Sequence, residues 1–284
     1  MNILVTGSNG QLGSELRELE KQYKQYKFFF TDFHELDITN AEKTMQFVKS
    51  NKIETVVNCA GFTAVDAAEA QKSEAALINA TGAKNLAQAC AKVNALLIHI
   101  STDYVFEGRS FKPYTENDTA GPKTTYGKTK LDGEIEVIFN AKRALIFRTS
   151  WLYSSYGRNF IKTIVEKAKA EKELKVVYDQ VGNPTYAGDL AKAILDIIPK
   201  VPQKIRTEIY NYSNEGVASW YDLAHAIIRI KNIDCQLKPV LSKEFPSEAI
   251  RPHYSVLNKA RVKNEFGISI PHWRDSLEKC LEKL

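Results

Sequence analysis

The sequence predicts an α/β fold in which a doubly wound parallel sheet carries a smaller α/β cap. Three observations support this prediction. Short apolar runs alternate with amphipathic stretches through the first 150 residues. The apolar runs are hydrophobic almost throughout, as in strands that are buried on both faces. The first of these runs ends in a glycine turn that opens a helix, which is typical of a βα unit.

Five strands are predicted in the first half of the chain. They cover NILVTG, FFFTD, ETVVNCAG, ALLIHIST and ALIFRTSW, at residues 2–7, 28–32, 54–61, 95–102 and 144–151. Each apolar run is about the length of an ordinary strand and is far too short to cross a membrane. The sequence therefore favours a parallel sheet with right-handed crossovers.

The helices expected between these strands show polar and apolar residues at helical spacing. They are predicted at residues 10–22, 40–51, 73–94 and 124–140. Asn40 is a plausible cap of the second helix, because its side chain can accept from the first turn. The alternation of strand and helix completes the pattern of a doubly wound sheet.

The pattern changes after Trp151. Helices are expected at residues 159–173 and 189–198, and a strand with a loop is expected between them. EIYNYSN, residues 208–214, is expected to return to the sheet, and two more helical runs lie at residues 221–230 and 272–284. We therefore predict a first domain of residues 1–150 with a return near residues 186–213. Residues 151–185 and 214–284 are expected to form mainly the cap.

Composition and charge narrow the classes of function. The formal net charge is +5, but Lys and Arg alternate with acids, and no basic run interleaves with aromatic residues. Nucleic-acid binding is therefore not expected, whereas an anionic small molecule suits the positive surplus. The four cysteines form no C-x-x-C or zinc spacing, and no signal peptide or membrane span is recognisable. We expect a cytoplasmic protein without a bound metal or a membrane partner.

A glycine-rich loop follows the first predicted strand. Gly7, Gly10 and Gly13 form a G-x-x-G-x-x-G pattern at the point where the first helix begins. Glycine permits the tight turn, the close approach of backbone to phosphate and the close packing of helix on strand. The helix N-terminus then offers unpaired N–H groups to an anion. The loop therefore predicts that residues 1–150 form a Rossmann domain that binds a dinucleotide.

An acid is expected about 20 residues after such a loop, at the end of the second strand. Asp32 stands there, where its carboxylate can accept a hydrogen bond from a ribose 2′-hydroxyl. No Arg or Lys adjoins it to favour a 2′-phosphate, so this position favours NADH. Asp37 and Ile38 follow, and they offer an acid and an apolar surface to an adenine ring.

Tyr126 and Lys130 are four residues apart on a predicted helix, so they lie on one face. The pair can be an ordinary surface pair, or it can be an acid beside the cation that tunes it. A free phenol has a pKa near 10, and a neighbouring ammonium stabilises the phenolate and lowers that pKa. A phenol tuned in this way is a usable general acid.

These features occur together with further motifs that span residues 7–257. With them, the chain resembles the extended short-chain dehydrogenase/reductase family and, within it, the dTDP-4-dehydrorhamnose reductases. The motifs that carry this resemblance are GQLG, VNCAGFTAVD, STDYVFEG, YGKTKLDGE, RTSWLY, DQVGNPT and RPHYSVL.

The resemblance implies an activity and roles for residues. The activity is the NAD(P)H-dependent reduction of the C4 ketone of dTDP-4-dehydro-L-rhamnose to dTDP-L-rhamnose, which serves the synthesis of cell-surface polysaccharide. Tyr126 would be the general acid, with Lys130 and Thr102 beside it. The implied cofactor-binding residues are Gly10, Gln11 and Leu12 in the glycine loop and Gly61, Phe62 and Thr63 after the third strand. The implied substrate-binding residues, in the cap and at the sheet edge, are Thr102, Asp103, Trp151 and Arg251.

Several alternatives stay open at this stage. Another sugar-nucleotide reductase or epimerase would have the same fold, and a regulatory subunit of methionine adenosyltransferase resembles the same branch. The cofactor is expected to be NADPH or NADH, the small-molecule partner a sugar nucleotide, and a homodimer is compatible with the sequence. Some relatives use magnesium through clustered acids at a dimer interface; here Glu15 is present, but Asp189 is the only acid in residues 186–189, so no metal is expected.

Overall fold

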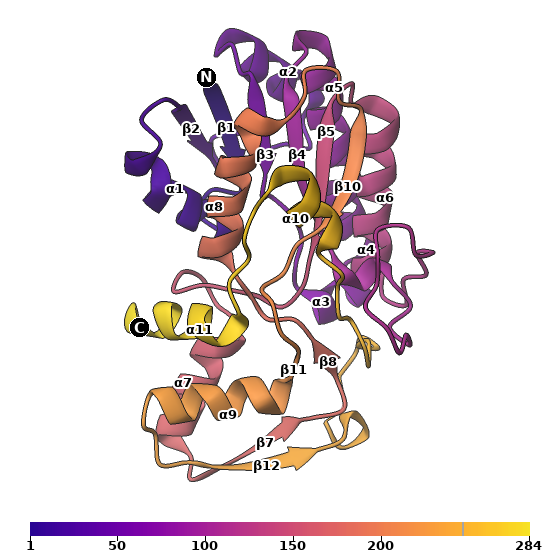
Figure 1. Ribbon diagram of the computed structural model, residues 1–284. Helices are drawn as coiled ribbons and strands as arrows, with labels where there is room; N and C mark the ends of the chain where they lie inside the picture. The colour runs from indigo at the N-terminus through magenta and orange to yellow at the C-terminus, as the bar shows by residue number, and fades with distance from the viewer. Residues whose placement is uncertain (246) are drawn as a thin grey trace.

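A six-stranded parallel sheet forms the framework of the protein (Figure 1). The computed structural model describes residues 1–245 and 247–284. The sheet has the order β10-β5-β4-β3-β1-β2, and every neighbouring pair is parallel. The strands are β1 (Asn2–Thr6), β2 (Lys27–Thr31), β3 (Thr55–Asn58), β4 (Leu96–Thr102), β5 (Ala144–Thr149) and β10 (Thr207–Asn211). The predicted fold class is confirmed, and so is the return of residues 208–214 to the sheet, as β10.

Helices cover both faces of the sheet. Successive side chains of each strand point to opposite faces, so an apolar strand has side chains to bury on both. Ile3 and Val5 of β1 contribute to one apolar cluster, and Leu4 between them contributes to another. The first cluster includes α1 (Gln11–Leu19), α8 (Ala187–Ile197) and α10 (Ala260–Phe266). The second includes α2 (Ala41–Ser50), α5 (Gly82–Val93) and α6 (Thr125–Asn140). The sheet is therefore buried on both faces, as its apolar strands predict.

The segment between β3 and β4 differs from the single helix predicted from residue 73. It contains α3 (Val65–Ala70), α4 (Lys72–Ala76), a π-helical turn η2 (Leu77–Thr81) and then α5. Within the π-turn, the side chain of Asn79 accepts from Phe62 N at 2.8 Å and donates to Phe62 O at 3.1 Å. A π-turn inserts an extra residue into a helix and often marks a functional site. Local periodicity does not register such an insertion, so the prediction missed it.

A smaller lobe lies below the sheet in Figure 1. It contains α7 (Phe160–Ala170), α9 (Trp220–Ile230) and α11 (Trp273–Glu282), with a parallel strand pair β7 (Glu173–Val177) and β12 (Gln236–Val240). These three helices contribute to a separate apolar cluster that includes Trp273 and Leu277. Two further pairs of two-residue strands follow. β6 (Leu152–Tyr153) pairs with β9 (Thr185–Tyr186), and β8 (Val181–Gly182) pairs with β11 (Ala218–Ser219).

The chain crosses between the two parts more than once. β10 and α8 pack with the sheet, and α10, which was not predicted as a helix, packs against β10 through Val262 and Phe266. Part of the segment 214–284 therefore lies against the sheet rather than in the lobe. The division of the chain into two domains at the predicted boundaries stays a prediction. None of the helices in the described part of the chain has the length and apolar content of a membrane span.

Helix α6 packs unusually close to its neighbours. A Cβ atom on Gly127 would lie 2.2 Å from Tyr104 O, and one on Gly133 would lie 2.3 Å from Asn79 O. Beyond these glycines, the buried Glu134 carboxylate accepts from Arg148 Nε at 2.9 Å and Nη2 at 2.7 Å. It also accepts from Ser101 Oγ at 2.5 Å. This network joins α6 to β4 and β5.

We predict that Arg148→Met destabilises the protein by about 3 kcal/mol, because it leaves the Glu134 carboxylate buried without its counter-charge. The free energy of unfolding in urea measures this change. Lys172→Met is the matched control: Lys172 pairs with Asp234 at 3.1 Å, but the two side chains are 88% and 97% exposed. Exposed pairs contribute little, so the control is expected to unfold like the parent. Equal stability of the two variants would contradict the structural role of the buried pair.

Candidate active site

A cavity of about 730 Å³ lies at the carboxyl ends of the sheet strands, between the sheet and the lobe. This size is that of a small-molecule site, and the carboxyl edge is where parallel α/β sheets bind ligands. Almost all of the predicted site residues line it. They are Gly7, Gly10, Gln11, Leu12, Asp32, Asp37, Ile38, Gly61, Thr63, Thr102, Asp103, Tyr126, Lys130, Trp151 and Arg251.

Phe62 is the predicted residue that does not line the cavity. Both its backbone N–H and its carbonyl are occupied by the Asn79 side chain, which also donates to Thr129 Oγ1 of α6 at 3.0 Å. Asn79 thereby fixes the loop after β3 to α6. No sequence signal distinguished Asn79 from other polar residues in the long helical stretch.

The glycine loop is shaped as a backbone cradle. Gly7 has a φ of +62°, and a Cβ there would lie 2.6 Å from Ala60 N. A Cβ on Gly13 would lie 2.5 Å from Ser8 Cα. These contacts explain two of the three glycines, since any other residue would push the loop away from the sheet.

The first turn of α1 is suited to an anion. Gly10 is its N-cap, no side chain caps it, and no acid stands in the turn. Its N–H groups therefore face the cavity edge without an acceptor from a side chain, and the helix dipole favours a negative group there. The residues present thus fit the pyrophosphate of a dinucleotide.

The acids expected near the adenosine end lie at the cavity, but they also serve the local backbone. Asp32 accepts from Asn9 N at 2.9 Å and from Phe33 N at 2.8 Å. It therefore holds the glycine loop in place and retains lone pairs for a ribose hydroxyl. Asp37 accepts from Thr39 N at 2.9 Å and Thr39 Oγ1 at 2.7 Å.

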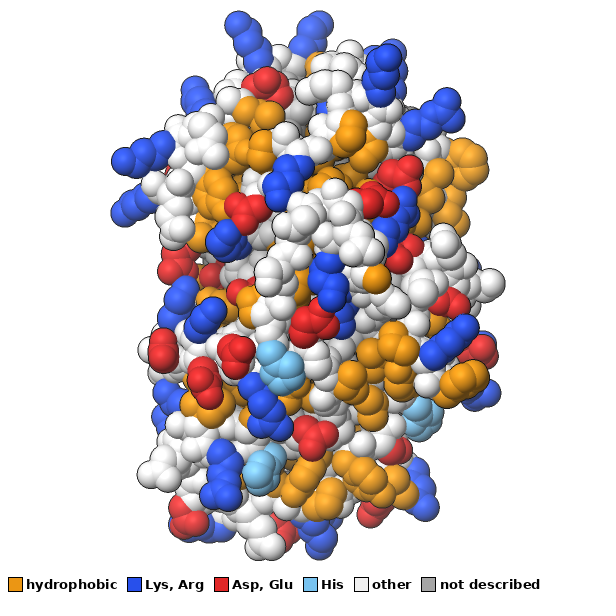
Figure 2. All heavy atoms as spheres, in the orientation of Figure 1, with side chains coloured by type: hydrophobic (Ala, Val, Ile, Leu, Met, Phe, Trp, Pro, Cys, Tyr) orange, Lys and Arg blue, Asp and Glu red, His pale blue; other side chains and the backbone are white. Residues whose placement is uncertain are grey.

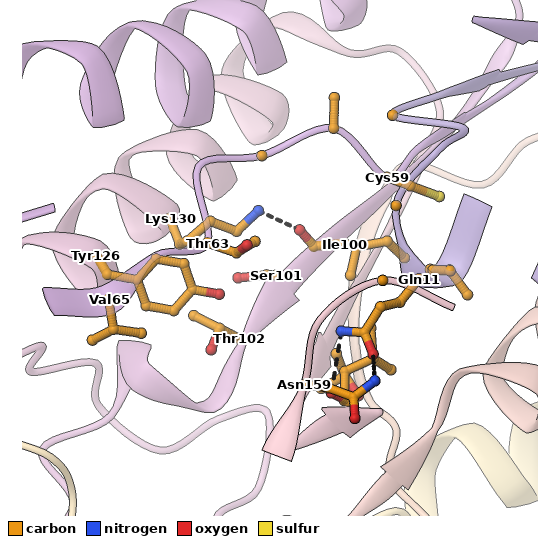
Figure 3. Close-up of a pocket in the computed structure, with 18 of the residues that line it drawn as sticks. Gln11, Cys59, Thr63, Val65, Ile100, Ser101, Thr102, Tyr126, Lys130 and Asn159 are labelled. Carbon is orange, nitrogen blue, oxygen red and sulfur yellow. Dashed lines mark hydrogen bonds between the residues drawn. The ribbon is translucent and has the colours of Figure 1, made fainter. Parts of the chain in front are cut away.

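Tyr126, Lys130 and Thr102 come together from α6 and β4 (Figure 3). The phenol of Tyr126 points toward Thr102, whose hydroxyl donates to Asp103 Oδ1 at 3.0 Å. Lys130 Nζ donates to Ile100 O at 2.5 Å, and it would lie 3.7 Å from a Cβ on Gly61. The predicted shared face of the helix is thus present, and it faces the cavity.

Burial determines the protonation of this group. It raises the pKa of Tyr126 above its ordinary value, despite the opposing effect of the Thr102 hydroxyl. It lowers the pKa of Lys130 to about 8, although the Glu134 carboxylate opposes the change. The expected lowering of the Tyr126 pKa by Lys130 is not seen here, because burial dominates and the ammonium is turned to a backbone carbonyl. The phenol is therefore fully protonated at neutral pH, as a proton donor must be.

The predicted substrate residues surround the outer part of the cavity. Asp103 is buried, accepts from Thr102 Oγ1 at 3.0 Å, and has a pKa raised by burial to about 6. Its Oδ2 has no partner among residues 1–245 and 247–284. Arg251 pairs with Asp66 at 2.6 Å and donates to Tyr104 OH at 3.4 Å.

Trp151 adopts a left-handed backbone conformation with a φ of +48°. That conformation costs about 1 kcal/mol or more in a residue with a side chain. Its ring stacks on Trp220, with centroids 3.6 Å apart and an interplanar angle of 5°. Packing of the two indoles offsets the backbone strain and leaves a flat aromatic wall on the lobe side of the cavity.

Glu15, considered above as a metal ligand, is engaged inside the protein. Its carboxylate accepts from Ser154 Oγ at 2.5 Å and from Tyr186 OH at 3.4 Å, and Lys283 Nζ lies 3.8 Å away. Burial raises the pKa of Glu15, partly offset by the Ser154 hydroxyl. Among the residues that the structure describes, no three His, Cys, Asp or Glu side chains gather as metal ligands.

Several lining residues were not predicted. Tyr104 packs edge-on against Tyr126, with ring centroids 5.5 Å apart. Arg158 and Asn159 come from the segment before α7, and Trp220 comes from α9. These residues belong to no motif that the sequence analysis recognised, so only the folded structure places them at the cavity.

The chain is similar to known proteins over nearly its whole length. A family model described as the RmlD substrate binding domain matches residues 1–284. The chain is 36% identical to dTDP-4-dehydrorhamnose reductase of Aggregatibacter actinomycetemcomitans, with 97% of each chain covered.

Two solved structures of dTDP-4-dehydrorhamnose reductases are also similar. The protein of Clostridium acetobutylicum is 42% identical, with a TM-score of 0.95 and 99% of each chain covered. The protein of Bacillus anthracis, in complex with NADP, is 37% identical, with a TM-score of 0.95 and 100% and 99% of the two chains covered. A match over the whole length, in sequence and in fold, shows that this chain belongs to the family of the RmlD substrate binding domain.

Proposed function

We propose that this protein reduces the C4 ketone of dTDP-4-dehydro-L-rhamnose to dTDP-L-rhamnose, with NADPH or NADH as the reductant. The observation that carries the proposal is the protonated, buried Tyr126 beside Thr102 and Lys130, in a cavity that also contains the glycine loop. Relatives that share the fold and more than a third of the residues are named for this reaction.

The glycine loop and the first turn of α1 would hold the dinucleotide by its pyrophosphate, and Asp32 would meet the adenosine ribose. When bound, the reduced nicotinamide supplies the hydride. The chain supplies the cavity and the positioned groups that meet the ketone.

Tyr126 gives its phenolic proton to the ketone oxygen as negative charge develops there. The Thr102 hydroxyl lies beside the phenol and, turned from Asp103 toward the ketone, would be a second donor to the developing charge. Lys130 holds a positive charge near the resulting phenolate. It also adjoins the Gly61 loop, where the ribose of the nicotinamide would lie. The carbon gains the hydride and the oxygen gains the proton, which gives an alcohol.

The outer residues orient the sugar nucleotide. Asp103 presents an oxygen without a partner, which suits a sugar hydroxyl. Arg251 lines the same cavity as the glycine loop, and its planar guanidinium suits the diphosphate of the substrate. Figure 2 shows acidic and basic side chains interspersed over one face of the molecule, which accords with a small anionic ligand rather than nucleic acid.

The first prediction from the proposed function concerns Tyr126→Phe. Loss of the proton donor should lower kcat by about 10²–10⁴-fold, while the affinity for NADPH changes little. Oxidation of NADPH and of NADH, followed at 340 nm with enzymatically generated dTDP-4-dehydro-L-rhamnose, gives the rate. A parent protein that folds, binds the cofactor and turns over neither cofactor with this substrate would refute the assignment and favour another sugar nucleotide or a regulatory role.

The second prediction concerns pH. Because the pKa of Lys130 is lowered to about 8, the ammonium is present below that pH and is lost as pH rises through it. We therefore expect kcat/KM for NADPH, which reports groups of the free enzyme, to fall above pH 8. In Lys130→Arg the cation persists to higher pH, so this fall should disappear, whatever the new absolute rate. A fall at the same pH in both proteins would assign it to another group.

The third prediction concerns Arg251→Met. Loss of a charged hydrogen bond to the substrate diphosphate should raise KM for the sugar nucleotide about tenfold or more, with KM for NADPH unchanged. Initial rates at varied concentrations of each substrate separate the two effects. An increase in KM for NADPH alone would place Arg251 at the cofactor instead.

A further inference from the structure

Two helices begin at the same corner of the cavity. Gln11 is the first residue of α1, and Asn159 is the N-cap of α7. Asn159 Nδ2 donates to Gln11 Oε1 at 2.9 Å, while its Oδ1 accepts from Lys162 N at 3.2 Å. One side chain thus caps α7 and ties it to α1; Figure 3 shows its bond to Gln11. The positive ends of two helix dipoles therefore lie side by side.

The segment that precedes α7 lies directly on the glycine loop. Gly157 has a φ of +63°, and a Cβ there would lie 3.2 Å from Gln11 Cγ. Gln11 Nε2 also donates to Leu152 O at 3.4 Å. The backbone of residues 152–159 is therefore held against the first turn of α1 at both of its ends.

Arg158 stands between Gly157 and Asn159, is exposed, and lines the cavity. Within residues 1–245 and 247–284, its guanidinium forms no ion pair or hydrogen bond. Other cations of the cavity are engaged: Lys130 donates to Ile100 O, and Arg251 pairs with Asp66. Arg158 is thus an unpaired cation beside two helix N-termini, and together these features attract an anion of more than one charge.

We propose that Arg158 binds the diphosphate of the dinucleotide cofactor from the lobe side, opposite the glycine loop. This inference rests on the proposed function, which supplies the cofactor. The diphosphate of the sugar nucleotide is the other source of the same chemistry. The cofactor is favoured because the residues on either side of Arg158, Gly157 and Asn159, lie against Gln11 of the glycine loop.

The test measures dissociation constants by isothermal titration calorimetry for NAD⁺, NADP⁺ and dTDP separately, without turnover. The full-length parent is compared with Arg158→Gln and Arg158→Lys. Lys169→Gln is the matched control, because Lys169 is an exposed cation in the last turn of the same helix, α7. Thermal unfolding confirms that the variants fold, which is expected because Arg158 is exposed.

Arg158→Gln should weaken NAD⁺ and NADP⁺ alike by about tenfold, which is the usual loss for a charge-assisted hydrogen bond. Arg158→Lys should lose less, because it keeps the charge but not the fork of donors. The affinity for dTDP, and all affinities of Lys169→Gln, should match those of the parent. Added salt should weaken dinucleotide binding more in the parent than in Arg158→Gln.

Three results would overturn the inference while leaving the proposed function intact. They are unchanged dinucleotide affinity in Arg158→Gln, a loss confined to NADP⁺, which would point to the 2′-phosphate, and a loss confined to dTDP. A parent protein that binds neither dinucleotide would overturn both the inference and the proposed function.

Discussion

The candidate site depends on the close packing of α6 against β4 and η2. Gly127 and Gly133 let the helix approach to a distance at which a single Cβ atom would collide with backbone oxygens. The buried Glu134–Arg148 pair then fixes the rotation of the helix over the sheet. Tyr126 and Lys130, on the same helix, are positioned at the end of β4 as a consequence. A helix held further away would present the same residues and would not bring them to Thr102.

The same burial that positions these groups sets their charge. Removal from water favours neutral forms, so it raises the pKa of the Tyr126 phenol and lowers the pKa of the Lys130 ammonium. Glu134, one turn after Lys130, opposes part of this effect and keeps the lysine charged at neutral pH. The cavity thus holds a protonated phenol together with a lysine that is still charged at neutral pH.

Much of the fold and of the site could be predicted because the relevant signals are local. Apolar strands buried on both faces, alternating with amphipathic helices, indicated the parallel sheet. The glycine spacing indicated the backbone cradle at the start of α1, and Asp32 followed at the end of β2. The four-residue spacing of Tyr126 and Lys130 put both on one helical face. Each of these patterns consists of residues that are close together in the sequence, so it can be recognised without the folded structure.

The sequence by itself therefore determined the sheet, the glycine cradle and the residue types at the centre of the candidate site. Only the tertiary structure decided which distant residues complete the cavity. Asn79 in its π-turn, Arg158 before α7 and the stack of Trp151 on Trp220 depend on contacts between segments far apart in the chain. The direction of the Tyr126 pKa shift belongs to this second group as well. Burial is a property of the packed molecule, and it outweighed the local charge that helical spacing alone suggested.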